Sequence, residues 1–209
     1  MKTEKVTLTQ KDKMANILFK LDAVKFGVFQ LSSGKPSPYY IDLRVMPSFP
    51  DAYREICDFY TKAIISQIGT ENFKRVVGIP LAGIPFASQV AYNLKKPFLY
   101  VRKNIKRHGR ERRVEGILVS GDKVLLVDDL LTTGLTLKET AEIVRAEGGV
   151  VTDAVVFLDR EEGGGELLEK TGVKIHPLLK ISEISKALYD LGAIDEEKLK
   201  TILKQVKKQ

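Results

Sequence analysis

The pattern of apolar and polar positions predicts two helices, with a short extended region between them, in the first third of the chain. The first helix follows Thr9, a typical N-cap residue, and its apolar residues recur every three or four positions. These apolar residues are Met14, Ile17, Leu18 and Leu21. The extended region covers residues 28–31 and 39–43, which are separated by the turn residues Ser33, Gly34 and Pro36. The second helix begins at Pro50 and ends near Gly69, and its apolar face consists of Ile56, Phe59, Tyr60, Ala63 and Ile64.

Strands and helices alternate over the rest of the chain. The expected strands are 76–79, 98–101, 123–127 and 154–158, and the expected helices begin near Ile84 and cover 135–147 and 195–208. Two segments, 124–127 and 154–158, are apolar at every position, which is typical of strands buried on both faces. We therefore expect an α/β fold with a doubly wound, mostly parallel sheet. The glycines at 163–165 are expected to form a mobile loop.

Length and composition indicate one soluble globular domain. The chain has 209 residues, of which 44% are hydrophobic and 29% are charged. We expect residues 1–209 to form this domain, with about 1–45 as a small N-terminal cap. The single cysteine, Cys57, cannot form an internal disulfide and lies on an apolar helical face, so we expect a buried thiol and a cytoplasmic protein. The N-terminus is too polar for a signal peptide, and prolines and glycines interrupt the uncharged stretch 76–94, so no membrane span is expected.

The positive charge of the chain is concentrated in one segment. The formal net charge is +7, and the segment 102–113 carries +6 of it. Its basic residues are Arg102, Lys103, Lys106, Arg107, Arg110, Arg112 and Arg113, and its one acid is Glu111. A nearly neutral protein with one strongly basic segment is expected to contact a polyanion locally rather than to coat nucleic acid.

The strongest candidate site is the segment 124–136, where a buried strand runs into two acids, a loop of threonines and glycine, and a helix. Ligands of open parallel sheets bind beyond the carboxyl ends of the strands. The loop hydroxyls and the backbone N–H groups at the helix N-terminus suit a phosphate monoester. Asp128 and Asp129 can accept hydrogen bonds from ribose hydroxyls and orient Mg²⁺ through water. An ordinary N-terminal cap would not need two adjacent, mutually repelling carboxylates after a buried strand, so this segment is interpreted as functional.

This segment resembles the phosphoribosyl pyrophosphate (PRPP) binding motif of the type I phosphoribosyltransferases. Three other parts of the chain are similar to the orotate phosphoribosyltransferases of that group: 25–44 to the N-terminal hood, 102–109 to the flexible catalytic loop, and 158–161 to the base-contacting loop. The four motifs occur in the family's order, and the resemblance covers nearly the whole chain. It implies a type I phosphoribosyltransferase-like, doubly wound, mostly parallel sheet with a small N-terminal hood.

The resemblance also implies a reaction. It is the Mg²⁺-dependent transfer of phosphoribose from PRPP to orotate, which gives orotidine 5′-monophosphate and pyrophosphate in pyrimidine (UMP) biosynthesis. The implied enzyme is a pentosyltransferase with an oxocarbenium-like transition state. The family further implies a homodimer with shared active sites, and Mg²⁺ held mainly by PRPP and water rather than directly by the protein.

Matched position by position, the resemblance assigns roles to named residues. Arg102, Lys103, Lys106 and His108 would reach pyrophosphate in the neighbouring subunit, and the last three would be catalytic. Thr132 and Arg160 would contact orotate. The ribose and its 5-phosphate would be held by Asp128, Asp129, Leu130, Leu131, Thr132, Thr133, Gly134, Leu135 and Thr136.

Three positions depart from the family pattern. Many members carry lysines where Ser32 and Ala82 stand, the latter in the loop 78–85 that is expected to touch pyrophosphate. Leu135 occupies a position that is usually small or hydroxylic, so Thr136 is expected to supply the missing donor. Tyr39 and Tyr40 suit a base-side contact and core packing equally well, and His176 is interpreted as structural.

Two alternatives compete with the orotate reaction. One is a purine phosphoribosyltransferase, which the segment 26–44 disfavours. The other is a nucleic-acid-binding regulator on the same scaffold, with a footprint formed by Arg107, Arg110, Arg112 and Arg113. The chain has no added helix-turn-helix region and no aromatic residues within its basic run, so nucleic acid is not the expected partner.

Overall fold

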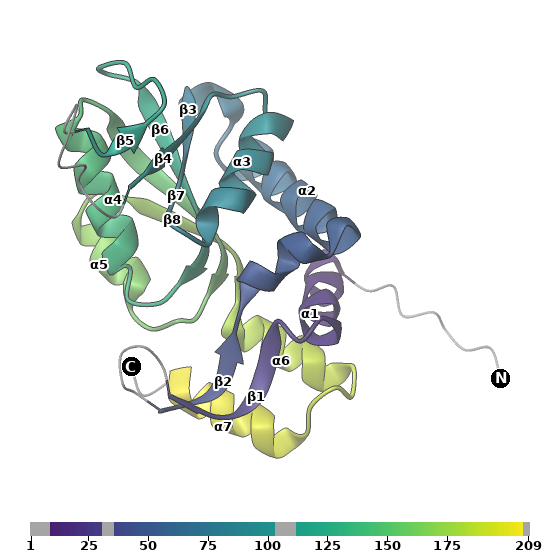
Figure 1. Ribbon diagram of the computed structural model, residues 1–209. Helices are drawn as coiled ribbons and strands as arrows, with labels where there is room; N and C mark the ends of the chain where they lie inside the picture. The colour runs from purple at the N-terminus through teal and green to yellow at the C-terminus, as the bar shows by residue number, and fades with distance from the viewer. Residues whose placement is uncertain (1–8, 31–35, 103–111, 207–209) are drawn as a thin grey trace.

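A six-stranded, mostly parallel sheet forms the centre of the protein (Figure 1). The computed structural model describes residues 9–30, 36–102 and 112–206. The strand order is β5-β4-β3-β6-β7-β8, and only the short edge strand β5 is antiparallel to its neighbour. The strands are β3 (Arg75–Gly78), β4 (Phe98–Val101), β5 (Val114–Glu115), β6 (Lys123–Leu131), β7 (Val150–Asp159) and β8 (Lys174–Lys180).

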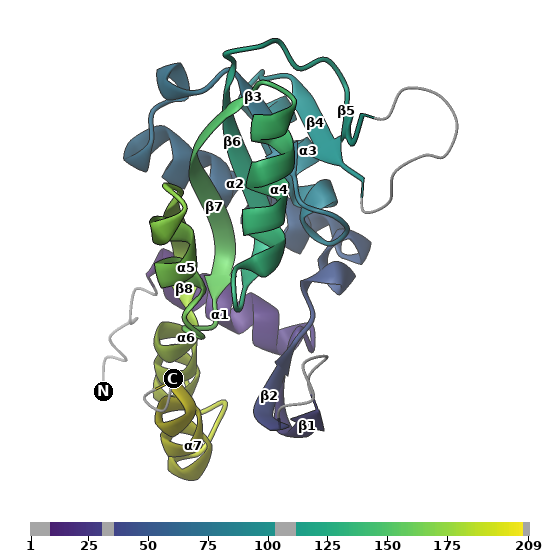
Figure 2. The same ribbon diagram turned by 90° about the vertical axis from the view of Figure 1, so that its left-hand side faces the viewer.

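Helices cover both faces of the sheet. On one face lie α2 (Pro50–Gln67) and α3 (Gly83–Asn93), and on the other lie α4 (Leu135–Ala146) and α5 (Gly164–Lys170) (Figure 2). Alternate residues of β6 point to opposite faces, so Leu125 and Val127 pack under α2 and α3, whereas Val124 and Leu126 pack under α4. Burial on both faces explains why this strand is apolar throughout, and it confirms the expected doubly wound α/β fold.

The two ends of the chain together build a smaller layer beside the carboxyl ends of the strands. It contains helix α1 (Gln10–Lys20), the antiparallel hairpin β1 (Val24–Gln30) and β2 (Pro36–Ile41), and the C-terminal helices α6 (Ile181–Asp190) and α7 (Glu196–Val206). Helix α6 packs on α1, and α7 packs on β2 (Figure 1). Two 3₁₀ helices, η1 (Leu43–Ser48) and η2 (Thr70–Asn72), complete the described elements. The hood expected over residues 1–45 thus includes residues from the other end of the chain.

Most of the predicted elements are confirmed. Thr9 caps α1, and its side-chain oxygen accepts from the backbone N–H of Asp12. Helix α2 begins at Pro50, with Ile56, Tyr60, Ala63 and Ile64 buried as expected and Phe59 partly buried, and Cys57 is buried as well. Within the described parts of the chain, no helix is both long enough and apolar enough to cross a bilayer.

Several boundaries were wrong. Strand β1 begins at Val24, β2 begins at Pro36, and Leu43 belongs to a 3₁₀ helix rather than to a strand. Strand β6 continues past Val127 to Leu131 because its backbone keeps pairing with β7. Both acids of the candidate site therefore lie in the strand, not in the loop after it.

The glycine run 163–165 begins helix α5 and was wrongly expected to be only a loop. Gly163 adopts φ 82° immediately before the helix. A Cβ on Gly164 would lie 2.4 Å from the carbonyl oxygen of Thr132 and 2.9 Å from the backbone nitrogen of Gly134. Glycine is therefore required where α5 meets the loop of residues 132–134, called the threonine loop.

Candidate active site

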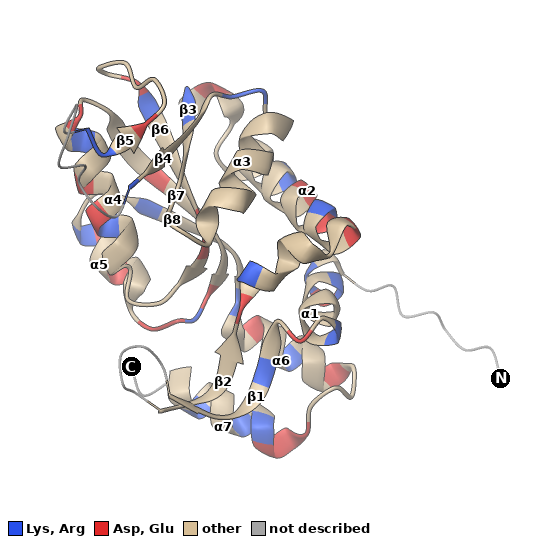
Figure 3. Ribbon diagram, viewed as in Figure 1, with Lys and Arg blue, Asp and Glu red and all other residues tan. Residues whose placement is uncertain are grey.

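A pocket of about 750 Å³ opens between the carboxyl ends of the central strands and the hairpin. Such a position is where ligands of open parallel sheets bind. Five parts of the chain line it: the end of β1, the end of β2 with the segment after it, the loop after β3, the end of β6 with its following loop and the start of α4, and the segment after β7. Acidic residues lie on the strand ends and loops at this edge of the sheet (Figure 3). The polar and charged side chains of the lining are Gln30, Tyr40, Asp42, Arg44, Asp128, Asp129, Thr132, Thr133, Thr136, Arg160 and Glu162.

The threonine loop forms a small hollow at the start of α4. Residues 130–137 and Asp128 line this hollow of about 40 Å³. Gly134 adopts φ 78°, and its carbonyl accepts the first helical hydrogen bond, from Lys138 N–H at 2.9 Å. The preceding N–H groups of the helix have no partner within the helix, so they and the dipole favour an anion. Leu135 is 62% exposed, so its side chain leaves the backbone of this turn accessible.

Asp128 and Asp129 occupy the end of β6 beside the N-terminus of α3. The backbone N–H of Asp129 donates to Oδ1 of Asp128 at 2.9 Å, and the hydroxyl of Tyr60 donates to the carbonyl of Asp128 at 2.6 Å. A Cβ on Gly83 would lie 2.6 Å from the same Oδ1. Burial and the neighbouring carboxylate of Asp129 raise the pKa of Asp128 well above its ordinary value. The raised pKa favours the protonated form of Asp128, which reduces the negative charge of the pair at the pocket wall.

Arg160 forms the other end of the pocket. It is 3% exposed, and its Nε lies 2.8 Å from Oε1 of Glu162. Its Nη2 donates to Oγ of Ser37 at 3.3 Å, and its guanidinium lies 4.7 Å from the ring centre of Tyr39. Tyr39 is fully buried, and burial raises the pKa of its phenol to about 12. These contacts hold the guanidinium in one orientation at the pocket wall.

The chain is similar in sequence to known proteins over most of its length. The family model described as "Phosphoribosyl transferase domain" matches residues 51–183. The orotate phosphoribosyltransferase of Staphylothermus marinus is 46% identical over 180 residues, covering 86% of each chain. That of Saccharolobus solfataricus is 42% identical over 190 residues, covering 90% of this chain and 94% of the relative. The chain belongs to the orotate phosphoribosyltransferase family.

Solved structures agree with this assignment. The crystal structure of orotate phosphoribosyltransferase from Aeropyrum pernix is 35% identical, with a TM-score of 0.76, over 87% of this chain and 99% of that one. The UMP synthase of Leishmania donovani has a TM-score of 0.86 at 29% identity over 95% of this chain, which spans 42% of that longer protein. The type I phosphoribosyltransferase fold and an enzymatic domain are therefore established, and the alternatives of a purine enzyme or a nucleic-acid regulator are not favoured.

The structure of this family member brings most of the expected site residues together. The main pocket is lined by residues 128–130, 132, 133, 135 and 136 and by Arg160. The hollow at the start of α4 is lined by Asp128 and by residues 130–137, which include Leu131 and Gly134. Arg102 lies at the end of β4, forms an ion pair with Glu115, and lines an adjoining pocket of about 310 Å³ that shares Pro80 and Thr136 with the main one. Lys103, Lys106, His108 and Ser32 lie outside the described residues, as do Arg107 and Arg110.

Sequence reasoning missed three charged residues of the site, Asp42, Arg44 and Glu162, and left the roles of the two tyrosines open. Tyr39 is a core residue beneath Arg160, whereas Tyr40 lines the pocket and accepts a hydrogen bond from Arg44 at 3.0 Å. Alternation along β2 is the signal that could have separated the two tyrosines. His176 lies within β8, 2.7 Å from Asp153 and away from the pocket, so its interpretation as structural is confirmed.

Proposed function

We propose that the protein transfers phosphoribose from PRPP to orotate, releasing pyrophosphate and orotidine 5′-monophosphate in pyrimidine biosynthesis. The observation that carries the proposal is the presence of a phosphate hollow and a buried, oriented arginine in one pocket. The hollow at residues 130–137 suits a sugar 5-phosphate. Arg160 suits the carboxylate of an anionic base, because a planar guanidinium binds carboxylates in a fixed geometry.

The chain's own residues then have the following roles. The N-terminal turn of α4 and the hydroxyls of Thr132, Thr133 and Thr136 hold the 5-phosphate. Asp128 and Asp129 accept hydrogen bonds from the ribose hydroxyls, and Thr132 and Arg160 orient orotate. Lys103, Lys106 and His108 neutralise the charge that develops on departing pyrophosphate.

The carboxyl groups of the site are compatible with Mg²⁺ carried by the substrate. No cluster of three or more metal-binding side chains occurs in the described parts of the chain, and the adjacent pair Asp128 and Asp129 offers oxygen ligands at the pocket edge. Mg²⁺ keeps several waters and binds through one or two carboxylates together with substrate phosphates. When bound, the ion would offset the charge of pyrophosphate, while Asp128 and Asp129 would hold its water shell.

The proposal includes a homodimer in which the basic segment of each subunit reaches the pocket of the other. The support is that Arg102, at the start of this segment, lines the adjoining pocket and is not part of the lining of the main pocket of its own subunit. The proposal also includes a cytoplasmic location, which is supported by the buried, unpaired thiol of Cys57.

Pyrophosphate release with PRPP, Mg²⁺ and a panel of nucleobases tests the proposed reaction. We expect turnover with orotate and at most weak turnover with adenine, hypoxanthine or uracil, because only orotate carries a carboxylate for Arg160. Preferred use of a purine or of uracil would contradict the proposal. Omission of Mg²⁺ should abolish turnover in the same assay.

A further inference from the structure

The described lining of the main pocket is too acidic for the substrate that the proposed function assigns to it. It carries four carboxyl groups, from Asp42, Asp128, Asp129 and Glu162, and two guanidinium groups, from Arg44 and Arg160. Arg160 is buried and paired with Glu162. PRPP and orotate together bring three anionic groups: a 5-phosphate, a pyrophosphate and a carboxylate. The hollow at α4 and Arg160 account for two of them. Among the described residues of the lining, Arg44 is the remaining cation for pyrophosphate, the most highly charged of the three.

Arg44 is held in a fixed orientation at the pocket wall. Its Nε donates to Oδ1 of Asp42 at 2.7 Å, and its Nη2 donates to Oδ2 of the same carboxylate at 2.8 Å. Nη2 also donates to the hydroxyl of Tyr40 at 3.0 Å. The Asp42 side chain in turn accepts from the backbone N–H of Arg44 at 3.1 Å and caps the 3₁₀ helix η1. A side chain fixed before the ligand arrives loses little conformational entropy on binding.

The contacts with Asp42 and Tyr40 use only one edge of the guanidinium. They involve Nε and Nη2, so the two N–H groups of Nη1 take part in none of them. The side chain is 62% exposed and lines the pocket. A guanidinium that is anchored along one edge and accessible along another can accept an anion without leaving its anchor.

The position of Arg44 favours pyrophosphate over the other two anions. It lines the pocket together with the loop residues Pro80, Leu81 and Ala82, from elements other than those that form the 5-phosphate hollow. Arg44 also lines this pocket together with Asp128 and Asp129, the acids that are proposed to hold the ribose, next to which the pyrophosphate must lie.

We propose that Arg44 binds the pyrophosphate group of PRPP and that Asp42 is its positioning residue. This inference rests on the proposed function. In this proposal the leaving group is bound by a cation on the pocket wall, Arg44, in addition to the basic segment 102–113.

Calorimetric titration with two ligands tests the role of Arg44. Mg²⁺-pyrophosphate probes the proposed contact, and orotidine 5′-monophosphate fills the 5-phosphate and base positions without it. We expect Arg44→Gln to weaken pyrophosphate binding about tenfold, as for an exposed charge-assisted hydrogen bond, and to change nucleotide binding less than twofold. Arg44→Lys should fall between wild type and Arg44→Gln, because it keeps the charge but loses the fork.

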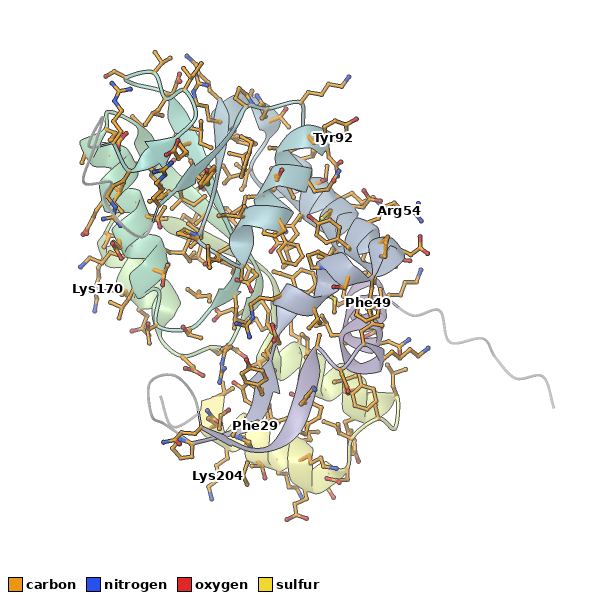
Figure 4. The ribbon with its side chains drawn as sticks, in the orientation of Figure 1. Phe29, Phe49, Arg54, Tyr92, Lys170 and Lys204 are labelled. Carbon is orange, nitrogen blue, oxygen red and sulfur yellow. The ribbon has the colours of Figure 1, made fainter. Side chains whose placement is uncertain are left out.

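The matched control is Arg54→Gln. Arg54 lies on the outward face of α2, 72% exposed and paired with Asp51 in the same helix (Figure 4). This variant should bind both ligands like wild type. Asp42→Asn should weaken pyrophosphate binding by a smaller factor than Arg44→Gln, because the guanidinium remains but loses its ionic anchor.

A rescue experiment gives a second measurement. Ala82 lines the same pocket with φ −69° and ψ −30°, a backbone conformation that lysine adopts without strain. Adding Ala82→Lys to Arg44→Gln returns a cation to the pocket wall, so the double variant should have a lower KM for PRPP than Arg44→Gln alone. Thermal unfolding of each variant verifies its folding.

The outcomes separate the two proposals. If wild type binds orotidine 5′-monophosphate but Arg44→Gln binds pyrophosphate as wild type does, the role of Arg44 is wrong. An equal loss for both ligands would also overturn it in favour of a general effect on the pocket. If wild type neither binds the nucleotide nor turns over PRPP, the proposed function itself fails.

Discussion

The backbone N–H of Arg160 donates a hydrogen bond to the carbonyl oxygen of Leu131 at 3.0 Å. Leu131 is the last residue of β6, and it pairs with Asp159 at the end of β7. The register of two parallel strands therefore sets the separation between the proposed base contact and the threonine loop that follows Leu131. A site fixed by sheet register is positioned more rigidly than one built only from loops.

Arg160→Lys should raise the KM for orotate about 10- to 100-fold and change the KM for PRPP much less. The lysine keeps the charge but loses the planar fork that contacts Glu162, Ser37 and the ring of Tyr39. Steady-state kinetics with each substrate varied in turn measures the two constants.

The control for this change is Arg145→Lys. Arg145 also lies partly buried, but it donates to the backbone carbonyls of Thr171 and Val151, away from the pocket. The Arg145→Lys variant should have a free energy of unfolding about 1 kcal/mol lower than that of wild type and an unchanged KM for orotate. A similar rise of the orotate KM in both variants would show that Arg160 acts through stability alone.

Gly83→Ala should destabilise the protein by about 1–3 kcal/mol and lower activity. The added Cβ would lie 2.6 Å from Oδ1 of Asp128 and 2.9 Å from the carbonyl of Val127, so either α3 or the end of β6 must shift. Denaturant unfolding measures the loss. Gly165→Ala is the matched control, because nothing lies within 4 Å of its Cβ position in α5. Alanine is preferred in helices, so this variant should be equally or more stable than wild type.

The pH dependence of stability should reveal the raised pKa of Asp128. In the unfolded chain the carboxyl ionises near pH 4, whereas in the folded protein burial and Asp129 keep it protonated to higher pH. Below about pH 4 both states hold the proton and burial of the charge costs nothing. As pH rises through the folded pKa, ionisation in the buried site lowers the free energy of unfolding.

Asp128→Asn should therefore be more stable than wild type at pH 8, by about 1–2 kcal/mol, and this advantage should shrink toward pH 4. The amide oxygen can still accept from the backbone N–H of Asp129. Urea unfolding of ligand-free protein at several pH values provides the measurement, with the exposed Asp58→Asn of α2 as control. An advantage that stays constant with pH would exclude titration of Asp128 as its cause.

The sequence predicted the parts of the protein whose pattern is local. Strand β6 was recognised because burial on both faces makes it apolar, and α2 because its apolar residues recur at helical spacing. Strand β8 was missed since it is an edge strand, where Pro177 and terminal lysines are tolerated. The length of β6 depends on its pairing with β7, which no local pattern records.

The site was predictable only where a motif was contiguous. The segment 128–136 was found from its own residues, and Arg160 was found because 158–161 resembles the family's base-contacting loop. Both line one pocket. Arg44 was not found from the sequence, because it joins the pocket lining only through the placement of η1 opposite the loop after β3. The glycine at 164 likewise matters through its approach to Thr132, a contact between segments far apart in sequence.

The proposed shared active site predicts complementation between two inactive variants. A subunit with Lys106→Ala lacks a working basic segment, and a subunit with Asp128→Asn and Asp129→Asn lacks a working ribose site. A mixed dimer combines one intact ribose site with one intact basic segment, while its second site holds both defects. With random pairing half of the dimers are mixed, so co-refolding should restore roughly a quarter of wild-type activity.

Co-refolding Lys103→Ala with Lys106→Ala is the control for this complementation. Each subunit then has a damaged basic segment, so neither site of the mixed dimer is intact, and activity should stay at the level of the parents. Native mass spectrometry of differently tagged subunits verifies that mixed dimers form. If they form and the first pair also recovers nothing, each basic segment serves its own subunit, because only a segment acting across the dimer can separate the two defects.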